Sequence, residues 1–161
     1  MENKNELGIY IHIPFCKQKC YYCDFISFTN KKCYENEYVN NLKKELDSYN
    51  LSKYNVTTIY IGGGTPSIIS EYNIQEILHK IKEKIKDNKT NWKDIEITIE
   101  VNPGTVDIQK LEKYKEAGVN RLSIGLQSMN NKLLKKIGRI HTFEEFLTVY
   151  NNAKKIGFDN I

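Results

Sequence analysis

The sequence predicts an α/β fold built on a parallel β-sheet, and three features of the chain indicate this fold class. Short stretches rich in isoleucine, valine and threonine alternate with stretches of helical periodicity. Such an alternation is typical of parallel strands joined by right-handed helical crossovers. The length of 161 residues and the hydrophobic content of 40% are sufficient for one folded domain.

Four segments have the composition of buried strands. They carry mostly β-branched residues and few charges, which favours strands covered on both faces, and they span residues 8–13, 56–62, 95–101 and 120–126. The final residues, 157–161, resemble the beginning of a fifth strand. We therefore expect about four βα units, with the pattern truncated inside the fifth.

Four helices are predicted between and after these strands. Ser70, Asp107 and Thr142 are residue types that cap helix N-termini, and the last of them opens the capping-box pattern T-x-x-E. Gly118 and Gly157 are typical helix-stop residues. The expected helices cover residues 34–49, 70–85, 107–118 and 142–157.

The composition argues against several classes of protein. A net charge of +4, without a basic run interleaved with aromatic residues, does not predict binding to nucleic acid. No apolar stretch approaches the 18 residues of a membrane span, and the N-terminal "MENKNEL" lacks the apolar centre of a signal peptide. We therefore expect a cytoplasmic protein, in which clustered cysteines favour metal binding or catalysis over disulfides.

Unusual stretches follow each predicted strand. A cysteine cluster follows the first, "GGGTP" follows the second, "EVNPG" spans the end of the third and "GLQS" the end of the fourth. In parallel α/β folds the loops at the carboxyl ends of the strands build the active site. The four stretches are therefore expected to converge on one rim.

Three of the four cysteines lie within eight residues, in a C-x3-C-x2-C spacing made by Cys16, Cys20 and Cys23. Thiolates are soft ligands that select zinc, copper(I) or iron–sulfur clusters. Structural zinc usually takes four ligands, whereas three thiolates leave one iron of a [4Fe–4S] cluster open to a small molecule. We favour the cluster, with a zinc site and three unrelated structural thiols as alternatives.

Two neighbouring residues are not expected to be ligands. His12 lies in the predicted first strand, where it should alternate away from the cysteine-bearing loop as a packed residue. Cys33 lies where a helix should begin and is interpreted as a free thiol.

Residues of the other loops suit an adenosylated amino acid bound to the open iron. Gly63 and Gly64, in "GGGTPS", permit close approach of the backbone to a ligand, although an ordinary tight turn also explains them. Glu100 can accept hydrogen bonds from a ribose or an amine, and Gln127 offers a side-chain amide. Arg139 can pair with a carboxylate through two hydrogen bonds. Taken singly, the last three also fit surface or structural roles.

The cysteine spacing joined to the glycine motif resembles the radical S-adenosylmethionine (SAM) superfamily over nearly the whole chain. The resemblance implies a partial TIM-type (β/α)6 barrel, with residues 1–161 as the N-terminal part of the radical SAM core domain. It implies that Cys16, Cys20 and Cys23 hold a [4Fe–4S] cluster whose open iron chelates SAM. The reduced cluster would then cleave SAM to a 5′-deoxyadenosyl radical.

Further stretches resemble the oxygen-independent coproporphyrinogen III oxidase family, namely "YIHIPFC", "IGGGTPS", "EVNPG", "RLSIGLQS" and "GRIHT". This resemblance implies that one group of residues contacts the cluster-bound SAM or its neighbour: Tyr10, Gly63, Thr65 and Glu100. It implies that a second group matches contacts to a second SAM in the oxidases: Tyr22, Gln127 and Arg139. Arg121, the other arginine of the chain, is expected to be structural.

Phe25 departs from the oxidase pattern. Bacterial oxidases of the family carry a further cysteine at this position, whereas the "CDF" form resembles a sister branch of haem chaperones. The short segment before the first strand also fits that branch. The resemblance thus implies a protein that binds haem and delivers it to acceptor haemoproteins. The alternative is an oxidase that decarboxylates coproporphyrinogen III to protoporphyrinogen IX, so whether the chain is an enzyme stays open.

Overall fold

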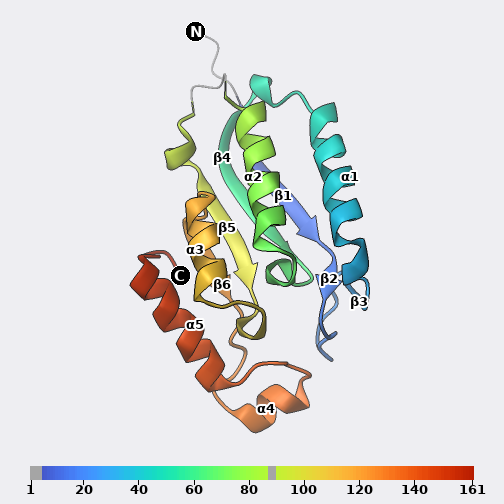
Figure 1. Cartoon of the computed structure of the whole chain (residues 1–161), viewed down its shortest axis with the longest axis vertical. Helices are drawn as coiled ribbons and strands as arrows, with labels where there is room; N and C mark the ends of the chain where they lie inside the picture. The colour runs from blue at the N-terminus through green and yellow to red at the C-terminus, as the bar shows by residue number, and fades with distance from the viewer. Residues whose placement is uncertain (1–4, 87–89) are drawn as a thin grey trace.

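A four-stranded parallel sheet forms the centre of the computed structural model, which describes residues 5–86 and 90–161 (Figure 1). The strands pair in the order β1 (Glu6–Ile13), β4 (Asn55–Gly63), β5 (Glu96–Val101) and β6 (Arg121–Ile124). All four predicted strands are confirmed, with small shifts at their ends. The first four residues of "MENKNEL" lie outside the described residues.

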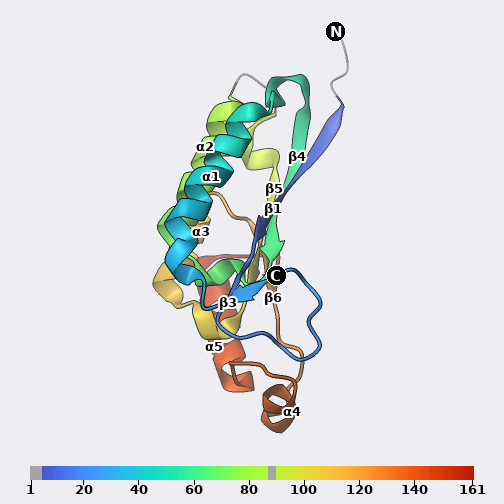
Figure 2. The ribbon, with the colours of Figure 1, turned by 90° about the vertical axis from the view of Figure 1, so that its right-hand side faces the viewer.

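Four helices pack on one face of this sheet (Figures 1 and 2). The Ser70 and Asp107 side chains accept hydrogen bonds from backbone N–H groups of the helices that follow, and Thr142 forms the predicted capping box. Gly157 ends the last helix with a φ of 91°, in the left-handed region. The predicted helices are confirmed as α1 (Glu35–Ser48), α2 (Glu71–Lys84), α3 (Ile108–Glu116) and α5 (Phe143–Ile156).

The two faces of the sheet differ because side chains alternate along each strand. Every second position is a buried apolar residue, as in Ile11, Ile13, Ile59, Ile61, Ile97 and Ile99. Their polar neighbours, including Tyr10, Tyr60 and Glu100, alternate with them. Figure 2 shows no helix over that second face among the described residues. The expectation of strands covered on both faces is therefore wrong here. Strands buried on both faces are apolar at nearly every position, whereas these strands alternate between apolar and polar residues, which marks one apolar face.

A second, two-stranded parallel pair was not predicted. It joins β2 (Phe15–Cys16) to β3 (Phe28–Thr29), and the Phe28 N–H donates to the Pro14 carbonyl over 2.7 Å. The segment between the two strands carries the cysteines, and residues 16–27 are called the cysteine loop below. The pair fixes both ends of this loop beside the end of β1.

The short helix α4 (Asn131–Lys136) was also not predicted. Asn130 caps it by accepting hydrogen bonds from the backbone N–H groups of Lys132 and Leu133. Gly138 follows it with a φ of 79°. An N-cap asparagine and a stop glycine are the signals that would have indicated this helix. Five single-turn 3₁₀ helices complete the described elements: Lys32–Tyr34, Leu51–Lys53, Pro66–Ile68, Trp92–Asp94 and Pro103–Thr105.

The last residues return to the sheet edge beside β6. Asn160 forms an isolated parallel bridge with Arg121, and its carbonyl accepts a hydrogen bond from the Leu122 N–H. This is where a fifth strand was expected to begin. Arg121 forms an ion pair with Glu96 at 3.2 Å, which agrees with its expected structural role. No helix within 5–86 or 90–161 combines the length and apolarity needed to cross a membrane.

Ser67 joins the loops that follow β4 and β5. Its fully buried hydroxyl accepts a hydrogen bond from the Asn102 N–H at 2.9 Å and lies 2.6 Å from the Thr105 hydroxyl. The Thr105 hydroxyl itself donates to the Asn102 carbonyl, so the Ser67 hydroxyl donates to Thr105. Two loops of the rim are thus held in one position.

Replacing Ser67 with alanine should lower the free energy of unfolding by about 1 to 3 kcal/mol, because the Asn102 N–H loses its acceptor in the fully buried Ser67 side chain. Urea unfolding measures this difference. The matched control is Ser48→Ala at the exposed end of α1, where a change within about 0.5 kcal/mol is expected. Equal losses in the two variants would contradict this account of Ser67.

Candidate functional site

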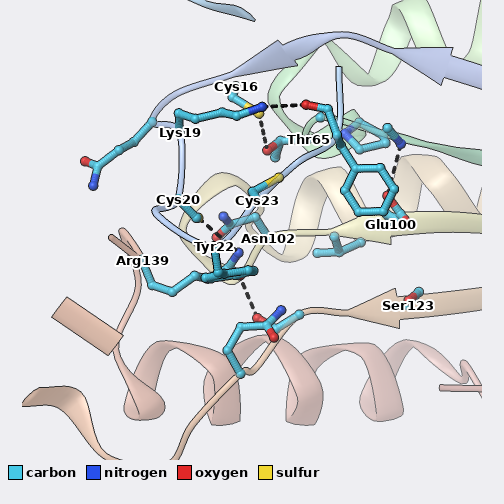
Figure 3. Close-up of a pocket in the computed structure, with 18 of the residues that line it drawn as sticks. Cys16, Lys19, Cys20, Tyr22, Cys23, Thr65, Glu100, Asn102, Ser123 and Arg139 are labelled. Carbon is cyan, nitrogen blue, oxygen red and sulfur yellow. Dashed lines mark hydrogen bonds between the residues drawn. The ribbon is translucent and has the colours of Figure 1, made fainter. Parts of the chain in front are cut away.

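A cavity of about 560 Å³ lies at the carboxyl ends of the sheet strands (Figure 3). The cysteine loop and the ends of β4, β5 and β6 all contribute to its wall. The predicted convergence of the four unusual stretches is therefore confirmed. The predicted site residues that line the cavity are Cys16, Cys20, Tyr22, Cys23, Gly63, Gly64, Thr65, Glu100, Gln127 and Arg139.

The three clustered cysteines face this one cavity from different environments. Cys16 is buried, with its sulfur 3.4 Å from the Thr65 hydroxyl. Cys20 and Cys23 are partly exposed, and the Cys23 N–H donates to the Cys20 carbonyl in a tight turn. Cys33 is exposed and does not line the cavity. Among the described residues, no three potential ligands converge tightly enough for a single metal ion.

The glycine turn packs directly against the cysteine loop. A Cβ on Gly64 would lie 2.9 Å from the Phe15 carbonyl oxygen and 3.0 Å from the Cys16 sulfur. Gly63 has a φ of 115°, which other residues rarely adopt, and a Cβ there would lie 2.7 Å from the His12 ring. Both glycines therefore allow a close approach of the turn to the thiol-bearing strand.

Glu100 is held rigidly at the end of β5. One carboxylate oxygen accepts the Tyr60 hydroxyl proton over 2.9 Å, and the other accepts the Gly63 N–H over 3.1 Å. Burial and the neighbouring carboxylate raise the pKa of Tyr60 above its usual value, so Tyr60 keeps this proton at neutral pH. The carboxylate thus borders the glycine turn as a fixed acceptor.

Tyr10 and His12 lie beside the cavity without lining it. The Tyr10 ring stacks on Tyr60 with centroids 6.2 Å apart, and its hydroxyl lies 3.0 Å from Nδ1 of His12. Nε2 of His12 lies 2.8 Å from the carbonyl oxygen of Ile26, in the cysteine loop. The expectation that His12 turns away from the loop is wrong, because the loop folds back over this face of β1.

The remaining predicted residues that line the cavity are Tyr22, Gln127 and Arg139. Gln127 has a φ of 69°, an uncommon backbone conformation that often marks binding sites. The Arg139 guanidinium donates to the Gly125 carbonyl over 2.8 Å and lies 3.9 Å from the Cys20 sulfur. Burial raises the pKa of Tyr22, which neighbours both Cys20 and Arg139.

Several lining residues were not singled out from the sequence, namely Gln18, Lys19, Asp24, Pro66, Val101, Asn102, Ser123 and Gly125. Asn102, Ser123 and Gly125 lie inside the quoted stretches at the strand ends, so their position in those stretches was an available signal. Gln18 and Lys19 lie between the cysteines. Figure 3 shows the Lys19 amino group directed along the loop, where it donates to the Phe25 carbonyl and the Ser27 hydroxyl.

The donors present fit an iron–sulfur cluster with a polar ligand beside it. Three thiols supply soft ligands, and a four-iron cluster binds each thiolate at a separate iron, so the sulfurs need not converge on one point. Glu100, Asn102 and Gln127 supply hydrogen-bonding groups on the facing walls. This arrangement can hold a charged cluster and orient an amino acid or nucleoside against it.

His141 anchors the segment between α4 and α5 to the rim. It is buried, and its Nε2 lies 3.2 Å from the Leu126 carbonyl, which requires a proton on that nitrogen. Its Nδ1 has no hydrogen-bond partner among the described residues. Burial, followed by the charge of Arg139, lowers the pKa of His141 below its ordinary value of 6.5.

Acidification should therefore destabilise the protein through His141. The unfolded chain takes up the proton first, so this contribution is complete above pH 6.5 and is lost as the pH falls below that value. The slope reaches about 1.4 kcal/mol per pH unit. Urea unfolding at pH 7.5 and 5.5 should show a smaller loss in His141→Gln than in the wild type. Replacing the exposed His79 with glutamine should leave the loss unchanged, and a loss that is equal in all three proteins would contradict the assignment.

Comparison with curated proteins finds relatives over almost the whole chain. The heme chaperone HemW of Buchnera aphidicola is 42% identical over 158 residues, which cover 96% of this chain and 41% of the relative. The heme chaperone HemW of Escherichia coli is 44% identical over 155 residues, which cover 94% of this chain and 40% of the relative. The chain thus spans about two fifths of the length of these relatives.

Solved structures give the same fold. The coproporphyrinogen III oxidase HemN of Escherichia coli, a radical SAM enzyme, superposes with a TM-score of 0.86 at 28% identity, covering 97% of this chain and 36% of that one. The model of the Radical SAM superfamily matches residues 10–161, from the middle of β1 to the last residue beside β6. The expected partial α/β barrel is confirmed, and the chain belongs to the radical SAM superfamily, whose members use a [4Fe–4S] cluster and SAM.

Proposed function

We propose that this chain is the N-terminal part of the radical SAM core domain of a cytoplasmic haem chaperone. Residues 1–161 would form that part, and Cys16, Cys20 and Cys23 would hold a [4Fe–4S] cluster. The observation that carries the proposal is that all three thiols, the glycine turn and Glu100 line one cavity. A ligand that touches all of these groups would account for their placement around one cavity.

The chain's own residues would position SAM beside the cluster. Gly63 and Gly64 leave room for a ligand to approach the backbone, and the Glu100 carboxylate offers a fixed acceptor for a hydroxyl or ammonium group. The Thr65 hydroxyl lies 3.4 Å from the Cys16 sulfur and would contact the cluster ligand. When bound, the reduced cluster supplies the electron for SAM cleavage.

Haem delivery is supported by the relatives and by Phe25. Proteins named heme chaperones are 42% and 44% identical to this chain. Phe25 is exposed and borders the cavity, at the position where the resemblance to the oxidases implies a further cysteine. An aromatic side chain there offers an apolar contact and no thiol. The expected partners are haem and acceptor haemoproteins, and no nucleic acid is proposed.

A second candidate function is the oxidative decarboxylation of coproporphyrinogen III. The similarity of this chain to the oxidase HemN, with a TM-score of 0.86, favours it. Tyr22, Gln127 and Arg139, the residues that the resemblance assigns to a second SAM in the oxidases, also line the cavity. The lower identity of 28% to that oxidase ranks this candidate second.

Replacing Cys20 with serine should abolish the cluster, because two thiolates do not retain a four-iron cluster with an open iron. Iron and acid-labile sulfide in the anaerobically reconstituted full-length protein measure the outcome. Cys33→Ser is the matched control, since Cys33 is exposed and does not line the cavity, and it should retain full iron and sulfide. Full cluster content in Cys20→Ser, or one zinc per chain without sulfide in the wild type, would refute the proposed ligands.

The two functions separate in one pair of assays on the reconstituted full-length protein. With coproporphyrinogen III, SAM and a reductant, we expect no protoporphyrinogen IX. With haem and an apo-haemoprotein, we expect haem to bind and transfer, which the absorption spectrum of the acceptor reports. Formation of protoporphyrinogen would establish the oxidase instead, and the absence of any haem binding would exclude the chaperone.

A further inference from the structure

The segment 137–139, which follows α4, forms hydrogen bonds with the cysteine loop. The Ile137 carbonyl accepts a hydrogen bond from the Tyr21 N–H over 3.1 Å, and the Gly138 carbonyl accepts one from the Gln18 side chain over 3.0 Å. A Cβ on Gly138 would lie 3.4 Å from the Cα of Cys20, so the two backbones run close together. These contacts join segments up to 120 residues apart in sequence and place residue 139 beside the second cysteine.

Arg139 uses this position to face the Cys20 sulfur. One terminal nitrogen of its guanidinium is fixed by the Gly125 carbonyl at 2.8 Å, and the other lies 3.9 Å from the Cys20 sulfur, the range of a weak N–H···S contact. Figure 3 shows this contact, with Tyr22 adjacent to both residues. Glycine at position 125 leaves room for this arrangement. A Cβ there would lie only 3.2 Å from the guanidinium. The guanidinium is thus fixed between a strand end and a thiol.

Arg139 differs from the other basic residue of the cavity wall in the direction of its charged group. Two basic side chains line the cavity, and the Lys19 amino group is turned to the Phe25 carbonyl and the Ser27 hydroxyl. Within the described part of the chain, Arg139 is the basic residue with a hydrogen-bond contact to a cysteine sulfur. Its Nε is buried and has no hydrogen-bond partner among the described residues, whereas the residue as a whole is partly exposed. Guanidinium stays protonated at any physiological pH, so this charge is permanent.

We propose that Arg139 is a positioning residue that tunes the redox potential of the cluster through the Cys20 sulfur. The proposal rests on the cluster site proposed above. Reduction adds one electron from a low-potential donor to the cluster, and no bond to the protein forms or breaks. The reduced cluster carries one more negative charge, which a neighbouring cation and an N–H···S contact stabilise. This role differs from the contact to a second SAM that the resemblance to the oxidases implies.

The test is a redox titration of the full-length protein after anaerobic reconstitution and without SAM, so that SAM binding does not contribute. Dithionite and redox mediators set the potential, and the electron paramagnetic resonance signal of the reduced cluster is measured. In Arg139→Gln, the ratio of reduced to oxidised cluster at a fixed potential should fall by about threefold to tenfold relative to the wild type. The midpoint potential should therefore become more negative.

Arg121→Gln is the matched control. It removes the other arginine of the chain, whose side chain contacts Glu96 and Thr98 and does not line the cavity. Both substitutions change the net charge equally, so a general charge effect would shift both potentials. We expect the Arg121→Gln potential to match the wild type. A normal potential in a fully loaded Arg139→Gln protein, or equal shifts in both variants, would overturn the proposal.

Cluster content separates this proposal from the proposed function. A wild type without iron and sulfide would refute the cluster site and the proposal with it, whereas a loaded wild type with no shift in Arg139→Gln would refute only the role of Arg139. If Arg139→Gln takes up no cluster, the iron and sulfide content of Arg139→Lys tests the electrostatic role instead. Lysine restores the charge, so recovery of iron and sulfide would support the electrostatic role. Failure of the lysine variant as well, with a normal melting temperature, would overturn it.

Discussion

The parallel pairing of β1, β4, β5 and β6 is the constraint on which the candidate site depends. Each crossover helix returns the chain to the same end of the sheet, so every strand finishes at one rim. The cysteine loop, the glycine turn, Glu100 and the segment after β6 are therefore neighbours in space. Without this shared direction, the same residues would lie at opposite ends of the molecule.

The cysteine loop has almost no regular structure, so its position depends on contacts from several distant segments. The pairing of β2 with β3 fixes its ends, His12 contacts its return path, and Gly64 packs against Cys16. The segment after α4 holds its middle. A loop that is supported on all sides keeps three thiols facing one cavity, which is what preorganised binding of a charged ligand requires.

The two faces of the sheet carry different kinds of side chain, and the candidate site lies next to the polar face. Alternate positions on each strand bury isoleucine against the helices, and the positions between them carry tyrosine, glutamate and arginine. On that polar face Tyr60 and Gly63 fix both oxygens of Glu100. The apolar core and the Glu100 side of the candidate site thus lie on opposite faces of the same strands.

The sequence by itself determined the βα alternation, the helix caps at Ser70, Asp107 and Thr142, and the identity of the thiols, because these depend on local periodicity and chemistry. Only the tertiary structure decided that the helices formed by the described residues all pack on one face of the sheet, that His12 contacts the loop, and that Tyr10 lies outside the cavity. It also decided that Arg139 faces Cys20. Those relations join residues far apart in the chain, and no local pattern encodes the distance between them.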